Sequence, residues 1–134
     1  MRFHHVAYTT ESIDKKAAEL TALFGFKPVI GPMIDATQKV RAVFLDMGNG
    51  ALMELLEPHG EKSPVLGHLK KGGGIYHTCY EVDDLDETLQ RLRDAGDVFV
   101  LGDPVPAPAF GGRRIAFFLT SDRDLIELLE AEKR

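Results

Sequence analysis

Two stretches of the chain, 72 residues apart (77 − 5), repeat one pattern of residues. The first reads FHHVAYTTESIDKKAAEL from Phe3, and the second reads IYHTCYEVDDLDETLQRL from Ile75. The repeat sets His5 on His77, and it also aligns Asp14 with Asp86 and Leu20 with Leu92. One period takes about half of the chain, so the sequence contains two copies of one supersecondary unit rather than an array of small repeats.

A second pair of stretches, VRAVFLDMGNGALMELLEP and RRIAFFLTSDRDLIELLEA, repeats with an offset of 73 residues (127 − 54). This alignment sets Glu54 on Glu127, and it also pairs Arg41 with Arg114, Phe44 with Phe117 and Leu52 with Leu125. The duplication therefore covers both the beginning and the end of each copy.

Residue patterns predict a strand, a helix and then three strands in each copy. Aromatic and β-branched residues indicate first strands at 3–9 and 75–82, and apolar residues at helical spacing follow from Ile13 and from Leu85. Thr10 or Ser12 can cap the first helix, Asp83 or Asp84 the second, and Gly25 and Gly96 fall where helices commonly end. Short strands at about 27–30 and 98–101 and hairpins turning at 48–50 and 121–123 complete the copies.

The sequence thus predicts an α+β fold of two tandem βαβββ modules that form a curved mixed sheet. We expect one domain over residues 1–134, with module 1 at about 1–70 and module 2 at about 75–134. The segment KKGGGI, residues 70–75, is interpreted as the joint between the modules. A phosphate-binding glycine loop is the alternative, but that motif requires a helix directly after it, and a strand is predicted here.

Composition excludes several classes of function. The net charge is −5 and no run of Lys or Arg exceeds two residues, so we expect no nucleic-acid partner. The apolar runs are far shorter than the roughly 20 residues of a membrane span, and the N-terminus does not resemble a signal peptide. Cys79 is the only cysteine, which fits a reducing compartment. We expect a cytoplasmic protein, without a membrane partner, that binds a small molecule.

Side-chain alternation predicts where the repeated polar residues point. His5 and His77 lie on the strand face opposite the bulkier apolar residues that would pack against the helices. Glu54 and Glu127 interrupt apolar strands, which is costly in a buried position unless the carboxylate has a partner. A lone inward His or Glu is more often a hydrogen-bonded structural residue. Because duplication places the same pair twice, the four residues together indicate a site for a divalent cation.

The repeated motifs resemble the vicinal oxygen chelate superfamily, specifically its glyoxalase I and methylmalonyl-CoA epimerase branches. The resemblance follows chain order through HHVAYTTESIDKKAAELTALFGF, MELLEP, SPVLGHLKKGGGIYHTCYEVDDLDETLQRLRDAG and RRIAFFLTSDRDLIELLE. It implies the glyoxalase/bleomycin resistance/dioxygenase fold, with paired modules around one divalent metal ion per chain (Zn, Ni, Co or Mn). The metal ligands of the family pattern fall on His5, Glu54, His77 and Glu127.

The resemblance also implies a reaction: a metal-dependent isomerase or lyase removes the proton next to a carbonyl of an acyl-CoA or related 2-oxo compound through an enolate. Glu127 is the expected base. The epimerase branch has a second acidic residue before the strand VRAVFLDM, where this chain has Thr37 or Gln38, with Asp35 nearby. Glyoxalase I typically has DP(D/N)G in the last hairpin, where this chain reads SDRD.

Three further functions stay open, all within the same superfamily. They are glyoxalase I proper (lactoylglutathione lyase), a metal-dependent dioxygenase and a non-catalytic ligand-sequestering resistance protein. Dioxygenases usually have two His and one Glu as ligands, so a fourth ligand at Glu54 argues against them. We also expect a homodimer, because the strands need covered edges.

Several other residues are weaker candidates. Phe110, with Gly111 and Gly112, could form a mobile lid, and Arg113 or Arg114 could hold a phosphate or carboxylate of the substrate. His59 and His68 are expected at the surface, and His4 is expected on the helix side or at a frayed end. Cys79 is expected to line a cavity rather than to act as a nucleophile.

Overall fold

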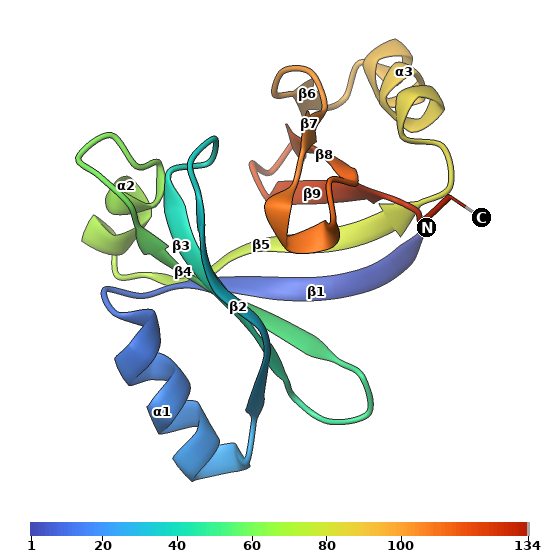
Figure 1. The fold of residues 1–134 in the computed structure, drawn as a ribbon. Helices are drawn as coiled ribbons and strands as arrows, with labels where there is room; N and C mark the ends of the chain where they lie inside the picture. The colour runs from blue at the N-terminus through green and yellow to red at the C-terminus, as the bar shows by residue number, and fades with distance from the viewer. Residues whose placement is uncertain (134) are drawn as a thin grey trace. The chain divides into compact units, whose positions relative to one another are not determined.

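The computed structural model describes residues 1–133 and confirms the α+β fold (Figure 1). Arg134, the end of the second predicted module, lies outside the described residues. The α-helices are α1 (Ile13–Phe24), α2 (Val65–Lys70) and α3 (Leu85–Ala95), and η1 (Pro108–Phe110) is a short 3-10 helix. The strands are β1 (Arg2–Thr9), β2 (Lys27–Asp35), β3 (Val40–Asp46), β4 (Leu52–Pro58), β5 (Gly74–Val82), β6 (Phe99–Val100), β7 (Val105–Pro106), β8 (Arg114–Leu119) and β9 (Leu125–Glu130).

The chain divides into two compact units, which are described separately. The first unit comprises residues 5–76. Its strands run in the order β2-β3-β4-β1, with β1 parallel to β4 and with β3 antiparallel to both of its neighbours. One strand, α1 and three further strands therefore follow one another along the chain, as the predicted βαβββ order requires.

The second unit comprises residues 1–4 and the chain from His77 onward. Its strand order is β5-β9-β8-β6, and the short strand β7 also pairs with β8. As in the first unit, the first strand is parallel to the last, and the last is antiparallel to the strand before it. The predicted duplication of βαβββ is confirmed at the level of strand pairing.

The two long helices begin and end in the same way. The Ser12 side chain accepts a hydrogen bond from the Lys15 N–H, and the Asp84 carboxylate accepts one from the Glu87 N–H. These caps satisfy backbone donors that have no partner within the helix. Gly25 and Gly96 close the helices at φ values of 73° and 76°, a backbone conformation that glycine adopts without steric cost.

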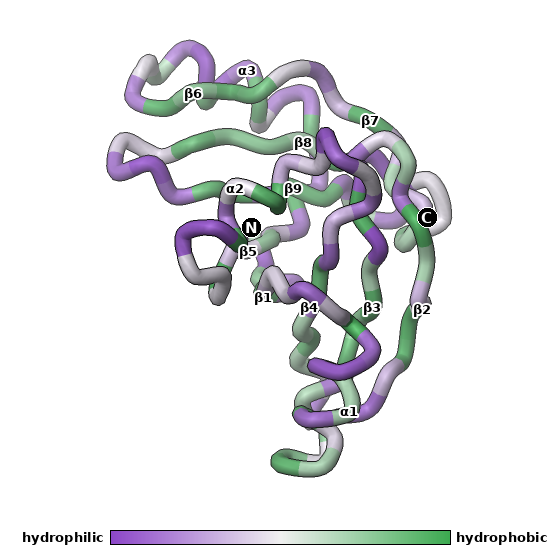
Figure 2. Tube along the Cα trace, turned by 90° about the vertical axis from the view of Figure 1, so that its left-hand side faces the viewer, coloured by the Kyte–Doolittle hydropathy of each residue, from purple (hydrophilic) through white to green (hydrophobic). Residues whose placement is uncertain are grey.

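Each unit packs its long helix onto one face of its sheet. In the first unit Ile13 and Leu20 of α1 pack with buried residues of β3 and β4, including Leu55. In the second unit Leu85 and Leu89 of α3 pack with β8 and β9. Figure 2 shows long hydrophobic stretches along strands such as β3 and β8. The helix-facing clusters are larger than the clusters on the other face of each sheet, as the alternation of residues predicted.

Some boundaries differ from those predicted. The strand expected at 27–30 extends to Asp35, because β2 stays paired with β3 across two register shifts. The strand expected at 98–101 is reduced to Phe99–Val100. Tyr76, which the alternation along 75–82 assigns to the face of Tyr80 and Val82, packs instead with Ala7 and Val65 in the first unit. Among the described residues, no helix is both long and apolar enough to span a membrane.

Candidate metal centre in two half-sites

The first half-site consists of His5 on β1 and Glu54 on β4. Strand register places Glu54 between Ala7 of the parallel strand and Phe44 of the antiparallel strand. His5 Nε2 lies 3.3 Å from Glu54 Oε1. His5 is fully buried, and the residue Glu54 is only 9% exposed. The strand pairing thus brings an imidazole nitrogen and a carboxylate oxygen together in a largely desolvated place.

The second half-site repeats this geometry with His77 on β5 and Glu127 on β9. Glu127 lies between Cys79 of the parallel strand and Phe117 of the antiparallel strand. His77 Nε2 lies 3.5 Å from Glu127 Oε1, and both residues are 4% exposed. The structure therefore brings His5 together with Glu54 and His77 together with Glu127, each within its own unit.

Both half-sites suit a divalent transition metal by the chemistry of their donors. A buried carboxylate is costly unless it is paired or coordinates a metal. Imidazole nitrogen suits Zn, Ni and related ions, carboxylate oxygen suits Mn and is also a common Zn ligand, and the strand pairing already points both donors of each half-site toward one another. The residues present therefore fit the kind of ion that the sequence resemblance implies.

A phenylalanine ring packs against the histidine of each half-site. The Phe44 and His5 ring centroids lie 5.1 Å apart, and the rings are inclined at 89°. The Phe117 and His77 centroids lie 5.5 Å apart at 76°. Both are edge-to-face contacts, the favoured geometry for aromatic pairs. Sequence reasoning aligned the two phenylalanines but gave them no role.

Arg113 and Phe110, two predicted substrate-binding residues, lie together in the second unit. The Arg113 guanidinium lies 5.6 Å from the centroid of the Phe110 ring, and its Nη1 donates a 2.9 Å hydrogen bond to Glu81. Glu81 also accepts hydrogen bonds from Arg2. The hydrogen bonds from Arg2, and then that from Arg113, hold the pKa of Glu81 below its ordinary value of 4.5. His4, at the end of β1, packs edge-to-face on Phe110.

Arg114, the third predicted substrate-binding residue, is held by two carboxylates. Its guanidinium donates to Glu130 and to both oxygens of Asp86, with 2.9 Å contacts to each residue. These hydrogen bonds lower the pKa of Glu130 and that of Asp86. A substrate anion would have to compete with Asp86, whose side chain is 69% exposed.

The first unit has the equivalent cluster, which sequence reasoning missed. Arg41 Nη1 lies 3.3 Å from Asp14 Oδ2 and 3.6 Å from Glu57 Oε1. Glu57 also accepts a 2.8 Å hydrogen bond from the Ile13 N–H at the start of α1. The signal for these ion pairs was present, because the repeat aligns Arg41 with Arg114 and Asp14 with Asp86. In each unit an arginine of the hairpin therefore contacts a carboxylate in the first turn of the helix.

The remaining candidates have local roles. His59 is exposed as expected, whereas His68 is half-buried, which corrects its surface assignment. Its Nδ1 lies 2.7 Å from Thr9 Oγ1, and its ring packs on Tyr76, so α2 packs against the ends of β1 and β5. Asp35 accepts a hydrogen bond from the Gln38 N–H and so stabilises the turn that contains Thr37.

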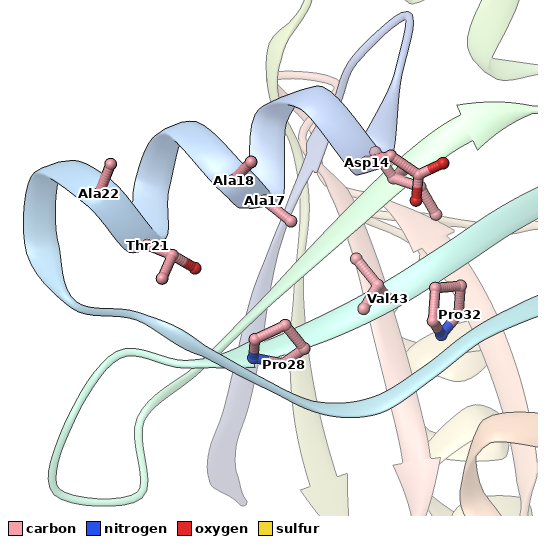
Figure 3. A pocket seen from close by; sticks show the side chains of 9 residues that line it. Asp14, Ala17, Ala18, Thr21, Ala22, Pro28, Pro32 and Val43 are labelled. Atoms are coloured by element: carbon pink, nitrogen blue, oxygen red, sulfur yellow. The ribbon is translucent and has the colours of Figure 1, made fainter.

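A separate cavity of about 480 Å³ lies between α1 and strands β2 and β3 (Figure 3). Its walls are mainly small apolar side chains, among them Ala17, Ala18 and Ala22 of α1 and Pro28 and Pro32 of β2. The one carboxylate in its wall, Asp14, is paired with Arg41. His5 and Glu54 are not among its lining residues, so this cavity is distinct from the first half-site.

Comparison with known proteins assigns the chain to a family. Residues 4–117 match the glyoxalase/bleomycin resistance protein/dioxygenase superfamily. The chain is 35% identical over 131 residues to the ethylmalonyl-CoA/methylmalonyl-CoA epimerase of Cereibacter sphaeroides, covering 95% of this chain and 96% of that protein. It is 33% identical over 133 residues to the mitochondrial methylmalonyl-CoA epimerase of Dictyostelium discoideum, covering 96% and 78% of the two chains.

Solved structures of epimerases have the same fold. The methylmalonyl-CoA epimerase of Mycobacterium tuberculosis superposes with a TM-score of 0.88 at 28% identity, covering 98% of this chain and 89% of that one. A variant of the Streptomyces coelicolor enzyme in complex with 2-nitronate-propionyl-CoA gives 0.84 at 30% identity and covers 99% of both chains. The chain therefore belongs to the glyoxalase/bleomycin resistance protein/dioxygenase superfamily, and methylmalonyl-CoA epimerases are among its relatives.

Proposed function

We propose that this protein is a metal-dependent isomerase that exchanges the proton next to the thioester carbonyl of an acyl-CoA of the methylmalonyl type. The observation that carries this proposal is the pair of equivalent half-sites, each with a buried His Nε2 beside a carboxylate oxygen. The epimerase relatives, which match over most of the chain, support the reaction class and the substrate class.

In this proposal one divalent ion (Zn, Ni, Co or Mn) is bound per chain by His5, Glu54, His77 and Glu127. When bound, such an ion supplies a Lewis acid that stabilises negative charge on a carbonyl oxygen while the neighbouring carbon loses a proton. The residues of both half-sites are largely shielded from water, so charges placed there would interact more strongly than in bulk solvent.

Glu127 is the proposed base. Its carboxylate would take the proton from the carbon next to the carbonyl, exchange it with solvent, and deliver a solvent-derived proton to the same carbon. Phe110, Arg113 and Arg114 are the proposed substrate-binding residues: the guanidinium groups would contact an anionic group of the substrate, and the Phe110 ring would cover an apolar part.

The turn at Thr37 and Gln38 distinguishes this chain from the two-base pattern of the epimerase branch. Neither side chain can accept a proton as a carboxylate does, and the Asp35 carboxylate is engaged by the Gln38 N–H at 3.0 Å. With Glu127 as the single base, a proton reaches one face of the planar enolate more readily than the other face. We therefore expect exchange of the substrate proton with solvent to outrun inversion of configuration.

The decisive experiment follows deuterium uptake by mass spectrometry in deuterated water. Metal-loaded protein is incubated with methylmalonyl-CoA and, separately, with the hemithioacetal of methylglyoxal and glutathione. We expect exchange into methylmalonyl-CoA that is lost on chelation and in Glu127→Gln, but is retained in Glu61→Gln, which changes an exposed glutamate. Turnover of only the hemithioacetal would reassign the protein to glyoxalase I. No reaction of either substrate would favour the dioxygenase or the ligand-sequestering function.

Metal content provides an independent test. Protein purified without chelator should contain about one divalent ion per chain by elemental analysis, and His77→Ala should lower this value. If wild-type protein stays metal-free after reconstitution with zinc, nickel, cobalt and manganese, the proposed metal centre is refuted.

We also propose that the protein is a homodimer in the cytoplasm, so light scattering at micromolar concentration should give twice the mass of the chain.

A further inference from the structure

We infer that Phe44 and Phe117 are positioning residues, which fix the ring planes of His5 and His77 so that each Nε2 faces the carboxylate of its half-site. This inference rests on the proposed function, since it assigns the phenylalanines a role in metal binding. Neither phenylalanine supplies a donor atom to the metal centre.

The geometry of the first half-site shows how such positioning works. Phe44 and Glu54 are register partners on neighbouring strands, and the Phe44 ring stands almost perpendicular to the His5 ring. Phe44 and His5 are both fully buried, so neither ring has space to change its orientation freely. The same hairpin therefore carries the carboxylate and the ring that orients the imidazole facing it.

The second half-site repeats the arrangement with different neighbours. Phe117 is the register partner of Glu127, and its ring is inclined at 76° to that of His77. The parallel strand places Cys79 next to Glu127, whereas Ala7 occupies that position in the first half-site. The contact between phenylalanine and histidine is thus retained although a neighbouring side chain differs.

Ring orientation matters because a histidine binds a metal only along the direction of its nitrogen lone pair. The second side-chain torsion of histidine is broad and only weakly restricted by its own geometry. A perpendicular aromatic neighbour narrows this torsion through packing and through the favourable edge-to-face contact. Hydrogen-bonding groups that orient a metal ligand commonly change metal affinity by about 10- to 100-fold when they are removed, and a ring that orients the ligand by packing alone should have a smaller effect.

Phe118 provides a matched control in the same strand as Phe117. Its side chain points to the opposite face of the sheet, where it packs in the core beneath α3, and the residue is 8% exposed. Phe117→Leu and Phe118→Leu therefore remove the same atoms from adjacent positions of β8. Only the first removes a ring that contacts a proposed ligand.

The test measures Co²⁺ binding, because its visible absorption reports ligand geometry and its affinity follows from competition with a chelator. We expect Phe44→Leu and Phe117→Leu to weaken Co²⁺ binding by roughly three- to tenfold, the range expected for loss of one edge-to-face contact, and to shift the visible bands. Phe118→Leu should lower stability to urea but leave affinity and bands unchanged. Phe117→Tyr, which keeps the ring, should restore wild-type affinity.

The possible failures are distinguishable. If Phe117→Leu alters Co²⁺ affinity and absorption no more than Phe118→Leu does, with both variants folded by circular dichroism, the positioning role is refuted while the metal centre stands. If wild-type protein binds neither Co²⁺ nor zinc, nickel or manganese, the proposed metal centre is refuted, and the role of the two phenylalanines with it.

Discussion

Replacing Glu81 by glutamine should destabilise the protein at neutral pH but not in acid. The carboxylate accepts hydrogen bonds of 2.9 Å and 3.1 Å from Arg2 and one of 2.9 Å from Arg113. The side chains of Glu81 and Arg113 are 23% and 19% exposed, whereas that of Arg2 is 52% exposed. Solvent screens the contact with the exposed Arg2 side chain, so we assign the stabilisation to the contact with Arg113, at about 1 kcal/mol.

The expected loss of unfolding free energy is therefore about 1 kcal/mol at pH 7. The sign of the pH dependence follows from the pKa of Glu81, which is lowered below 4.5 in the folded protein by Arg2 and then Arg113. Such a group stabilises the fold fully above its pKa in the unfolded chain, and this contribution is lost as the pH falls through the folded pKa. At pH 3 the difference between wild type and Glu81→Gln should shrink to a small fraction of its value at pH 7.

Urea unfolding followed by circular dichroism at both pH values measures this difference, with Glu61→Gln as the surface control. Equal losses at pH 7 and pH 3 would show that Glu81 contributes through packing rather than through its charge. That result would refute the ion-pair argument. A loss in Glu61→Gln as large as in Glu81→Gln would do so as well, because it would point to net charge instead of specific contacts.

The remaining predictions concern stability. Leu55→Ala and Leu128→Ala change equivalent, fully buried positions of the two units, and each should lower the free energy of unfolding in urea by about 2–5 kcal/mol. A loss below about 1 kcal/mol would mean that the core is not packed there as described. Thr9→Val should cost about 1–2 kcal/mol, because it removes the 2.7 Å partner of His68 Nδ1, and the NMR signals of the His68 ring should change. Ser12→Ala should cost about 1 kcal/mol by removing the cap of the first helix, whereas Ser12→Asp should cost little.

Much of the fold could be predicted because the side-chain period of a strand is two. Alternation along residues 3–9 sufficed to place His5 on the face opposite α1, since Val6 and Tyr8 pack against that helix's core cluster. The repeat aligns His77 with His5, so the same alternation places His77 on the face opposite α3. In each βαβββ module the first strand pairs with the last. With that pairing, the same alternation places each histidine near the glutamate of its own module.

Contacts that depend on loops could not be predicted in this way. The hydrogen bond between Thr9 and His68 joins residues 59 positions apart, and His68 lies in α2, a helix without a counterpart in the second copy of the repeat. The length of β2 was missed because Gly31 and Pro32 normally interrupt strands, and only the register shifts opposite β3 accommodate them. The ion pairs of Arg41 and Arg114 were missed as well, although the repeat aligns the two arginines and also aligns Asp14 with Asp86, so the sequence contained enough information to predict them.

Duplication also limits how the two carboxylates can come to differ. Immediately after a gene segment is duplicated, both glutamates have identical neighbours. If one glutamate is only a ligand and the other is also the base, that difference must arise from later substitutions nearby. One such difference is visible in the strand pairing, because the register partner of Glu54 is Ala7 and that of Glu127 is Cys79. Exchanging Ala7 and Cys79 in the present chain would measure how much this one pair of positions contributes to the separate roles proposed for the two glutamates.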